Sequence, residues 1–255
     1  MRPEPYIGAT GFKNPDQVEC VLAATAAVRQ KIMIGVLVSS KTLNGIPNKY
    51  PGISPAMRDV ASIFPPGNRT LNLVHYSTDD TRALGLELQR AREFGGENCQ
   101  GVQLNIPWPS TRTVEAYQRR WDTDIIVLQL GKQAMKEADN EPSRIAESLR
   151  AYEGLIDYAL IDASGGFGVP LVLDSTRRLL EVLYRLDWLH IGIAGGQCAD
   201  TIDEVAPLFR EFPGTSIDAQ GKLQTNGVLN VENTIAYVTK ASTMLFRQTQ
   251  GCGCS

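Results

Sequence analysis

Two glycine turns near the end of the chain have the composition of an anion-binding site. One is Ala194-Gly195-Gly196, and the other runs from Asp218 to Gly221. Because glycine has no side chain, backbone N–H groups in such turns can converge on a bound group, and a helix that begins beside them adds partial positive charge. We therefore expect Gly195, Gly196 and Gly221 to bind phosphate. The alternative is that these glycines only form tight turns.

A third glycine turn, Asn226-Gly227, precedes the helix that we expect from Val231. Backbone N–H groups of an extra turn at this place would point at the same anion. We expect this turn to complete the phosphate site.

Asp162 and His75 are the candidates for proton transfer. Asp162 ends an apolar run and precedes Ser164-Gly165-Gly166, a position that suits a carboxyl group acting as acid or base. His75 is one of 2 histidines, and an imidazole titrates near neutral pH. Each also has a purely structural explanation. An aspartate at the end of a strand often caps the following turn, and a histidine at the end of a strand is often a polar residue with satisfied hydrogen bonds and no role in catalysis.

Lys13, Lys41 and Asp218 are the candidates for contacts with a substrate. Each stands at or just beyond the end of an apolar run. A lysine amine can bind a carboxylate or a phosphate, or it can form an imine with a carbonyl carbon. An exposed lysine that contacts only water is the simpler interpretation of Lys13 and Lys41.

The charge of the chain argues against several classes of partner. The 255 residues include 25 basic and 28 acidic side chains, so the formal net charge is −3. This net charge gives the chain no overall electrostatic attraction to nucleic acid or to an anionic membrane. No cluster of His, Asp and Glu has the spacing of metal ligands, so we expect neither a metal nor a cofactor. The expected partner is a small phosphorylated substrate, and the sequence is compatible with a homo-oligomer.

The chain carries no pattern of export or membrane insertion. No stretch approaches the roughly 20 apolar residues that a membrane span needs, and the first residues lack the pattern of a signal peptide. The 5 cysteines are an odd number scattered over the chain, which favours reduced thiols over a disulfide framework. We therefore expect a cytoplasmic protein.

Short apolar runs that recur along the chain predict the elements that position these residues. Most of the runs are almost continuously apolar, as is typical of parallel strands covered on both sides. The expected strands are Tyr6–Thr10, Lys31–Val38, Leu71–His75, Val102–Ile106, Asp124–Leu130, Tyr158–Asp162, His190–Ala194 and Thr215–Ala219. The expected helices are Asp16–Gln30, Asp79–Phe94, Thr111–Arg120, Pro142–Tyr152, Ser175–Arg185, Thr201–Phe209 and Val231–Arg247.

Strict alternation of these strands and helices favours an α/β fold that closes into a single (β/α)8 TIM barrel over residues 1–250. An open doubly wound sheet is the alternative, because periodicity does not distinguish a closed sheet from an open one. Residues 251–255 are expected to form a mobile tail. The long segment Ser39–Pro55 would lie at the C-terminal rim, either as a lid or binding surface or as a solvated loop.

Four segments resemble, in order, the pattern of phosphoribosylanthranilate isomerase, a ribulose-phosphate-binding TIM barrel family. They are IGATGFKNPDQV from Ile7, YALIDASGGFG from Tyr158, IGIAGGQ from Ile191 and SIDAQGKLQTNGVLN from Ser216. That family converts an aminoaldose phosphate to an aminoketose by an Amadori rearrangement, with a cysteine after the first strand as base and an aspartate after the sixth as acid.

The resemblance implies roles for particular residues of this chain. Asp162 stands at the position of the catalytic aspartate, and Gly195, Gly196 and Gly221 stand at the phosphate-binding positions. Thr10 stands at the position of the catalytic cysteine. A threonine hydroxyl is far less acidic than a thiol, whose pKa is about 8.5, so Thr10 needs a strong helper to act as a base.

The sequence therefore predicts an enzyme that moves a proton on a small phosphorylated metabolite, similar to this isomerase family but with a different substrate. One alternative is an aldolase or lyase that uses a lysine as nucleophile. Another is a non-catalytic barrel that binds a ligand and has lost its base.

Overall fold

Eight parallel strands close into a barrel in a computed structural model, which describes residues 4–162 and 171–250 and the side chains up to residue 245. Neighbours in sequence pair with one another, and the last strand pairs with the first. The strands are β1 (Tyr6–Thr10), β2 (Lys31–Ser39), β3 (Thr70–Ser77), β4 (Gly101–Leu104), β5 (Ile125–Gly131), β6 (Tyr158–Asp162), β7 (His190–Ala194) and β8 (Ser216–Ala219). The predicted single (β/α)8 barrel is confirmed.

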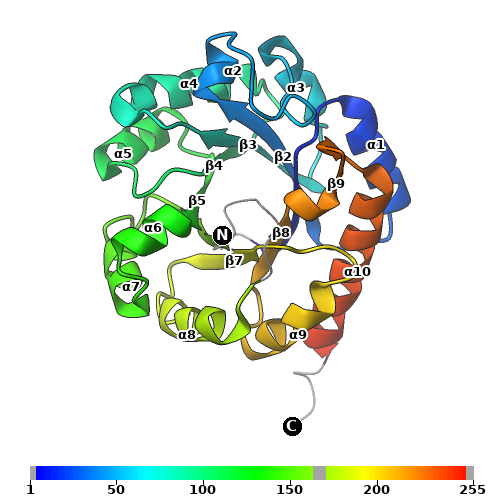
Figure 1. The fold of residues 1–255 in the computed structure, drawn as a ribbon, viewed down its shortest axis with the longest axis vertical. Coiled ribbons are helices and arrows are strands. Elements are labelled where there is room, and N and C mark those ends of the chain that lie inside the picture. The colour runs from blue at the N-terminus through cyan, green and yellow to red at the C-terminus, as the bar shows by residue number, and fades with distance from the viewer. Residues whose placement is uncertain (1–3, 163–170, 251–255) are drawn as a thin grey trace.

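Helices form a ring outside the strands (Figure 1). They are α1 (Pro15–Ala24), α2 (Ser40–Leu43), η1 (Met57–Asp59), α3 (Val60–Ile63), η2 (Thr81–Ala83), α4 (Leu84–Phe94), α5 (Thr111–Arg120), α6 (Lys132–Glu137), α7 (Pro142–Arg150), α8 (Leu173–Leu183), α9 (Ile202–Glu211) and α10 (Val231–Gln250). Among the described residues, no helix is long and apolar enough to cross a membrane. The tail predicted at residues 251–255 lies outside the described residues.

Helix α1 ends at Ala24, six residues before the predicted end at Gln30. The guanidinium group of Arg69 donates hydrogen bonds to the carbonyl oxygens of Leu22 and Thr25, at 3.3 and 3.0 Å, and so binds carbonyls at the helix end. The short helices α2, α3 and α6 were not predicted, because four to six residues are too few to show a helical period.

The interior of the barrel is filled by side chains. An apolar cluster that includes Tyr6, Met33, Leu73, Val127 and Leu160 occupies it. A separate and larger cluster packs the outer face of the strands against the helices. Because the barrel is packed, any ligand must bind at one of its ends.

Two glycines make room for polar side chains inside the barrel. A Cβ atom on Gly8 would lie 2.6 Å from Oδ1 of Asp218, and one on Gly35 would lie 2.2 Å from Oγ1 of Thr10. Gly8 is the register partner of Asp218, and Gly35 is that of Thr10. A side chain on Gly8 would displace Asp218, and a side chain on Gly35 would displace Thr10.

Gly8→Ala should therefore lower the free energy of unfolding by about 1–3 kcal/mol, the usual cost of an extra methyl group in a packed interior. Urea unfolding measures this cost. Gly85→Ala is the control, since the nearest atom to its new Cβ is 3.7 Å away, and its effect should stay within about 1 kcal/mol. Adding Asp218→Ala to Gly8→Ala should remove most of the cost, and strictly additive effects would contradict the proposed clash.

Candidate active site

Five polar side chains gather inside the barrel at the C-terminal ends of its strands. They are His75 on β3, Gln103 on β4, Gln129 on β5, Asp162 on β6 and Asp218 on β8. Each is at most 4% exposed. A buried polar atom without a partner costs about 1–3 kcal/mol, so the hydrogen bonds among these groups fix their arrangement.

Gln129 sets the direction of these hydrogen bonds. Its Nε2 donates to Oδ2 of Asp162 at 2.7 Å, because a carboxylate oxygen only accepts. Its Oε1 must then face the other way, where it lies 3.0 Å from Nε2 of Gln103 and 2.9 Å from Nε2 of His75. Both of these nitrogens therefore donate to Gln129.

His75 is consequently held with its proton on Nε2 and a lone pair on Nδ1. Burial lowers the pKa of His75, and the hydrogen bond with Gln129 and the charge of Asp162 oppose this shift only in part. Nδ1 is buried and has no hydrogen-bond partner among the described residues. The imidazole thus offers a neutral acceptor to a ligand.

Asp218 is the group best suited to exchange a proton near neutral pH. Burial raises its pKa to about 7, and the charge of Asp162 adds to this effect. The hydrogen bond that Nε2 of Gln103 donates to Oδ2 of Asp218, at 3.3 Å, favours the charged form and limits the rise, and the nearby backbone N–H of Ala219 and hydroxyl of Thr10 act in the same direction. Asp218 was predicted only as a substrate contact, whereas the structure gives it the properties of an acid or base.

Thr10 lies beside Asp218 and is buried. Its hydroxyl favours the charged form of the Asp218 carboxyl. Thr10 therefore acts on its neighbour, and the structure provides no group that would turn this hydroxyl into a base among the described residues.

The glycine turns and the two carboxyls line one small cavity. Gly195, Gly196 and Gly221 line it together with Asp162 and Asp218. The backbone φ angles of Gly195 and Gly196 are 121° and 69°, in the region that favours glycine. The free volume is about 20 Å³, enough for about one water molecule, so a bound phosphate requires the walls to separate.

Lys222 also lines this cavity, and the sequence analysis did not single it out. It belongs to η3 (Gly221–Leu223), the short helical turn after β8. The predicted extra turn at Asn226-Gly227 was wrong, because these residues connect β9 (Gln224–Thr225) to β10 (Val228–Leu229) in an exposed hairpin. Their φ angles of 52° and 75° suit this two-residue turn.

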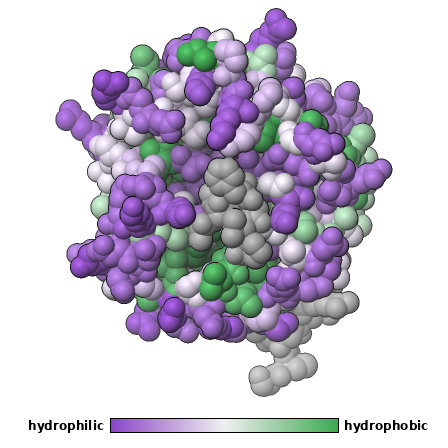
Figure 2. Space-filling view, in the orientation of Figure 1, coloured by the Kyte–Doolittle hydropathy of each residue, from purple (hydrophilic) through white to green (hydrophobic). Residues whose placement is uncertain are grey.

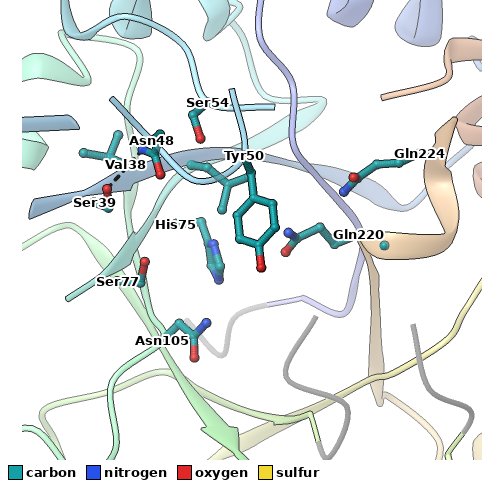
Figure 3. Close-up of a pocket in the computed structure, with 12 residues that line it drawn as sticks. Val38, Ser39, Asn48, Tyr50, Ser54, His75, Ser77, Asn105, Gln220 and Gln224 are labelled. Carbon is teal, nitrogen blue, oxygen red and sulfur yellow. Dashed lines mark hydrogen bonds between the residues drawn. The ribbon is translucent and has the colours of Figure 1, made fainter. Parts of the chain in front are cut away.

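A larger pocket of about 260 Å³ adjoins the small cavity and shares Gln220 and Gly221 with it. Figure 3 shows Tyr50, His75, Asn105 and Gln220 pointing toward one another from four separate segments. Figure 2 shows that hydrophilic residues cover most of the face that surrounds this region.

The segment after β2 forms one wall of this pocket. Ser39 caps α2, and Asn48 donates to the hydroxyl oxygens of Ser39 and Thr42 at 3.1 and 2.8 Å. Asn48, Tyr50 and Ser54 line the pocket. Of the two interpretations of this segment, the structure thus favours a binding surface.

Lys13 and Lys41 are not brought to either cavity. Both side chains are exposed, and Lys13 donates from Nζ to the carbonyl oxygen of Pro51 at 2.8 Å. Lys41 lies on α2. Lys13 therefore contacts the segment after β2, and a contact of either lysine with a substrate stays a prediction.

Gln103 is the main residue that the sequence analysis missed. Gly101, Gln103 and Asn105 alternate along β4 and its end, so they share the face that turns into the barrel. A polar side chain at an inward position of an otherwise apolar strand was the available signal.

No known family pattern matches the chain, and no curated protein is similar to it in sequence. Its fold is similar to that of phosphoribosyl anthranilate isomerase from Thermococcus kodakaraensis, with a TM-score of 0.64 and 15% identity over 94% of this chain and 99% of the other. For the corresponding enzyme of Pyrococcus furiosus the TM-score is 0.61 and the identity 14%, over 94% and 99% of the two chains. For tryptophan synthase subunit alpha from Legionella pneumophila the TM-score is 0.60 and the identity is 12%, over 96% of this chain and 93% of the other. At these identities the likeness establishes the fold.

Asp218→Asn should stabilise the protein at pH 8 and leave its stability nearly unchanged at pH 4. The folded protein holds the Asp218 proton up to a pKa of about 7, against 3.8 for an ordinary aspartate, so its stability falls as the pH rises between these values. The corresponding gain at pH 8 is up to about 4 kcal/mol. Urea unfolding of both proteins at several pH values measures it.

The exposed Asp187 provides a control, since Asp187→Asn should show no such pH dependence. An equal effect of Asp218→Asn at pH 4 and pH 8 would refute the raised pKa.

Proposed function

We propose that this protein is an enzyme that isomerises a small phosphorylated metabolite by moving a proton. The observation that carries the proposal is the small cavity, where the glycine turns with Gly195, Gly196 and Gly221 adjoin the carboxyls of Asp162 and Asp218. An anion held by the turns would bring the rest of its molecule alongside both carboxyls.

The two carboxyls suit the two halves of a proton transfer. One carboxylate removes a proton from the hydroxyl-bearing carbon next to a carbonyl or imine, while the other carboxyl, in its protonated form, donates a proton to the oxygen or nitrogen of that group, which gives an enediol or enaminol. The first carboxyl then returns its proton to the former carbonyl or imine carbon, while the second takes the proton of the hydroxyl group, so that both regain their initial states. No other reactant is consumed. Asp218 is suited to the role of base because its pKa of about 7 combines a populated carboxylate with useful basicity at neutral pH.

Asp218 would also supply the function that Thr10 lacks. Thr10 stands where the resembling isomerase family has its catalytic cysteine, and it lies beside Asp218 inside the barrel. A base on β8 in place of one on β1 approaches the substrate from a neighbouring strand. This change fits a substrate that differs from that of the isomerase family.

The charge of the cavity also bears on phosphate binding. Two carboxylates would repel a phosphate, but the raised pKa of Asp218, about 7, reduces the negative charge of the pair near neutral pH. Lys222 adds a positive charge at the same cavity. Lys222 and the backbone of the glycine turns together would offset the negative charge that the two carboxyls retain.

The lysine-dependent aldolase has less support, since Lys13 and Lys41 are exposed and line neither cavity. Lys222 lines the small cavity but is also exposed, whereas a lysine that forms an imine is usually desolvated. The non-catalytic barrel is the outcome in which a ligand binds but no proton is exchanged.

Phosphorylated sugars should raise the unfolding temperature of the protein. A ligand present at about 100 times its dissociation constant adds about 2.7 kcal/mol to the stability. Lys222→Gln should weaken this binding about 10-fold through the loss of a charged contact, whereas Lys41→Gln should not. Failure of ribose 5-phosphate, ribulose 5-phosphate, a reduced phosphoribosylanthranilate product analogue and inorganic phosphate alike to shift the transition would refute the phosphate site.

Proton transfer should appear as exchange of a carbon-bound hydrogen with deuterium when a ligand found by this screen is incubated with the protein in D₂O. Asp218→Asn and Asp162→Asn should each slow the exchange by about 10²–10⁴-fold while the phosphate still binds. Proton NMR measures the exchange, and Asp187→Asn serves as the control. Tight binding without exchange in the wild-type protein would favour the non-catalytic barrel.

A further inference from the structure

None of the described residues that line the larger pocket beside the small cavity is charged. Of the 12 residues drawn around it in Figure 3, none carries a charged side chain. The polar groups are hydroxyls and amides, such as those of Tyr50, Asn105 and Gln220, together with the imidazole of His75. Lys49 lies over the ring of Tyr50, 5.2 Å from its centroid, but does not line the pocket.

Three acceptor atoms in this part of the barrel are unsatisfied within the described chain, as is the hydroxyl group of Thr10 beside Asp218. Nδ1 of His75, Oε1 of Gln103 and Oδ1 of Asp218 are all buried and have no hydrogen-bond partner among the described residues. His75 faces the larger pocket, while Gln103 and Asp218 face the small cavity. A ligand that brings hydrogen-bond donors would satisfy these atoms and recover the cost of burying them.

A carboxylate fits this environment poorly. It would bring only acceptors to the lone pair of His75 Nδ1, and it would lose its hydration with no cation in the described lining to replace it. An ammonium group is also disfavoured, because no carboxylate is among the described residues that line the larger pocket.

We infer that the larger pocket binds an uncharged, hydroxyl-bearing end of the substrate, with one hydroxyl donating to Nδ1 of His75, and that it discriminates against a carboxylate. This inference rests on the proposed function, in which the phosphate of the same molecule lies at the glycine turns. Gln220 and Gly221 border both cavities, so one ligand can reach from one to the other. The substrate is thus a sugar phosphate or a polyol phosphate that carries no carboxylate-bearing aromatic group.

Two matched ligands test the inference by calorimetry. Ribitol 5-phosphate and ribonate 5-phosphate have the same chain length, and they differ in a terminal hydroxymethyl group against a carboxylate. The protein should bind ribitol 5-phosphate at least about 10-fold more tightly. Equal affinities, or a preference for ribonate 5-phosphate or for the corresponding 1-amino-1-deoxyribitol 5-phosphate, would overturn the inference.

Substitution of His75 tests whether this residue causes the preference for ribitol 5-phosphate over ribonate 5-phosphate. His75→Leu removes the Nδ1 acceptor, so the preference for ribitol 5-phosphate should fall to within about 3-fold. His75→Gln keeps both a donor for Gln129 and an acceptor oxygen, so it should retain more of the preference than His75→Leu does. His190 begins β7 at the other end of the barrel, and His190→Leu should keep the full preference. A full preference that persists in a folded His75→Leu protein would contradict the role of Nδ1.

Competition with inorganic phosphate separates failure of the inference from failure of the proposed function. If both ligands bind equally and inorganic phosphate displaces both, the phosphate site stands and the neutral pocket is wrong. If neither ligand nor inorganic phosphate binds, both proposals are wrong.

Discussion

The hydrogen bond from Gln129 to Asp162 is the interaction on which the arrangement of the barrel mouth depends. Both side chains are buried inside a closed barrel, where water does not replace a lost partner. Once the amide nitrogen of Gln129 faces the carboxylate, its oxygen must receive the nitrogens of His75 and Gln103. One contact thereby fixes the orientation of an imidazole and of a second amide on neighbouring strands.

The chemical properties of the site follow from these hydrogen bonds and from the space that a glycine leaves beside Asp218. Burial lowers the pKa of His75, which favours its neutral form, and burial raises the pKa of the Asp218 carboxyl to about 7. Gly8 gives Asp218 its place, because any side chain at this position would collide with it. The same group of buried polar side chains thus contains both the carboxyl with the raised pKa, Asp218, and the unpaired acceptor, Nδ1 of His75.

The sequence predicted the barrel correctly because eight apolar runs reflect burial of every strand on both faces. It placed Asp162, His75 and the glycine turns at the ends of expected strands, and the structure brings them to two adjoining cavities at one end of the barrel. It missed the bridging role of Gln103 and Gln129, which depends on the register between strands rather than on spacing along the chain. It did not predict the contact of Lys13 with Pro51 or the hairpin at Asn226-Gly227, because the path of a loop depends on contacts between segments that are distant in sequence.

The protonation of His75 tests the account most directly. Nitrogen-15 NMR of labelled imidazoles distinguishes a protonated nitrogen from one with a lone pair, and the spectrum of His75→Gln assigns the signals of the two histidines. The hydrogen bonds predict that His75 carries its only ring N–H proton on Nε2 and is mostly neutral at pH 6.5, where an ordinary imidazole is half protonated. A proton on Nδ1, or a mostly protonated imidazole at that pH, would contradict this prediction, because Gln129 would then not set the direction of the hydrogen bonds.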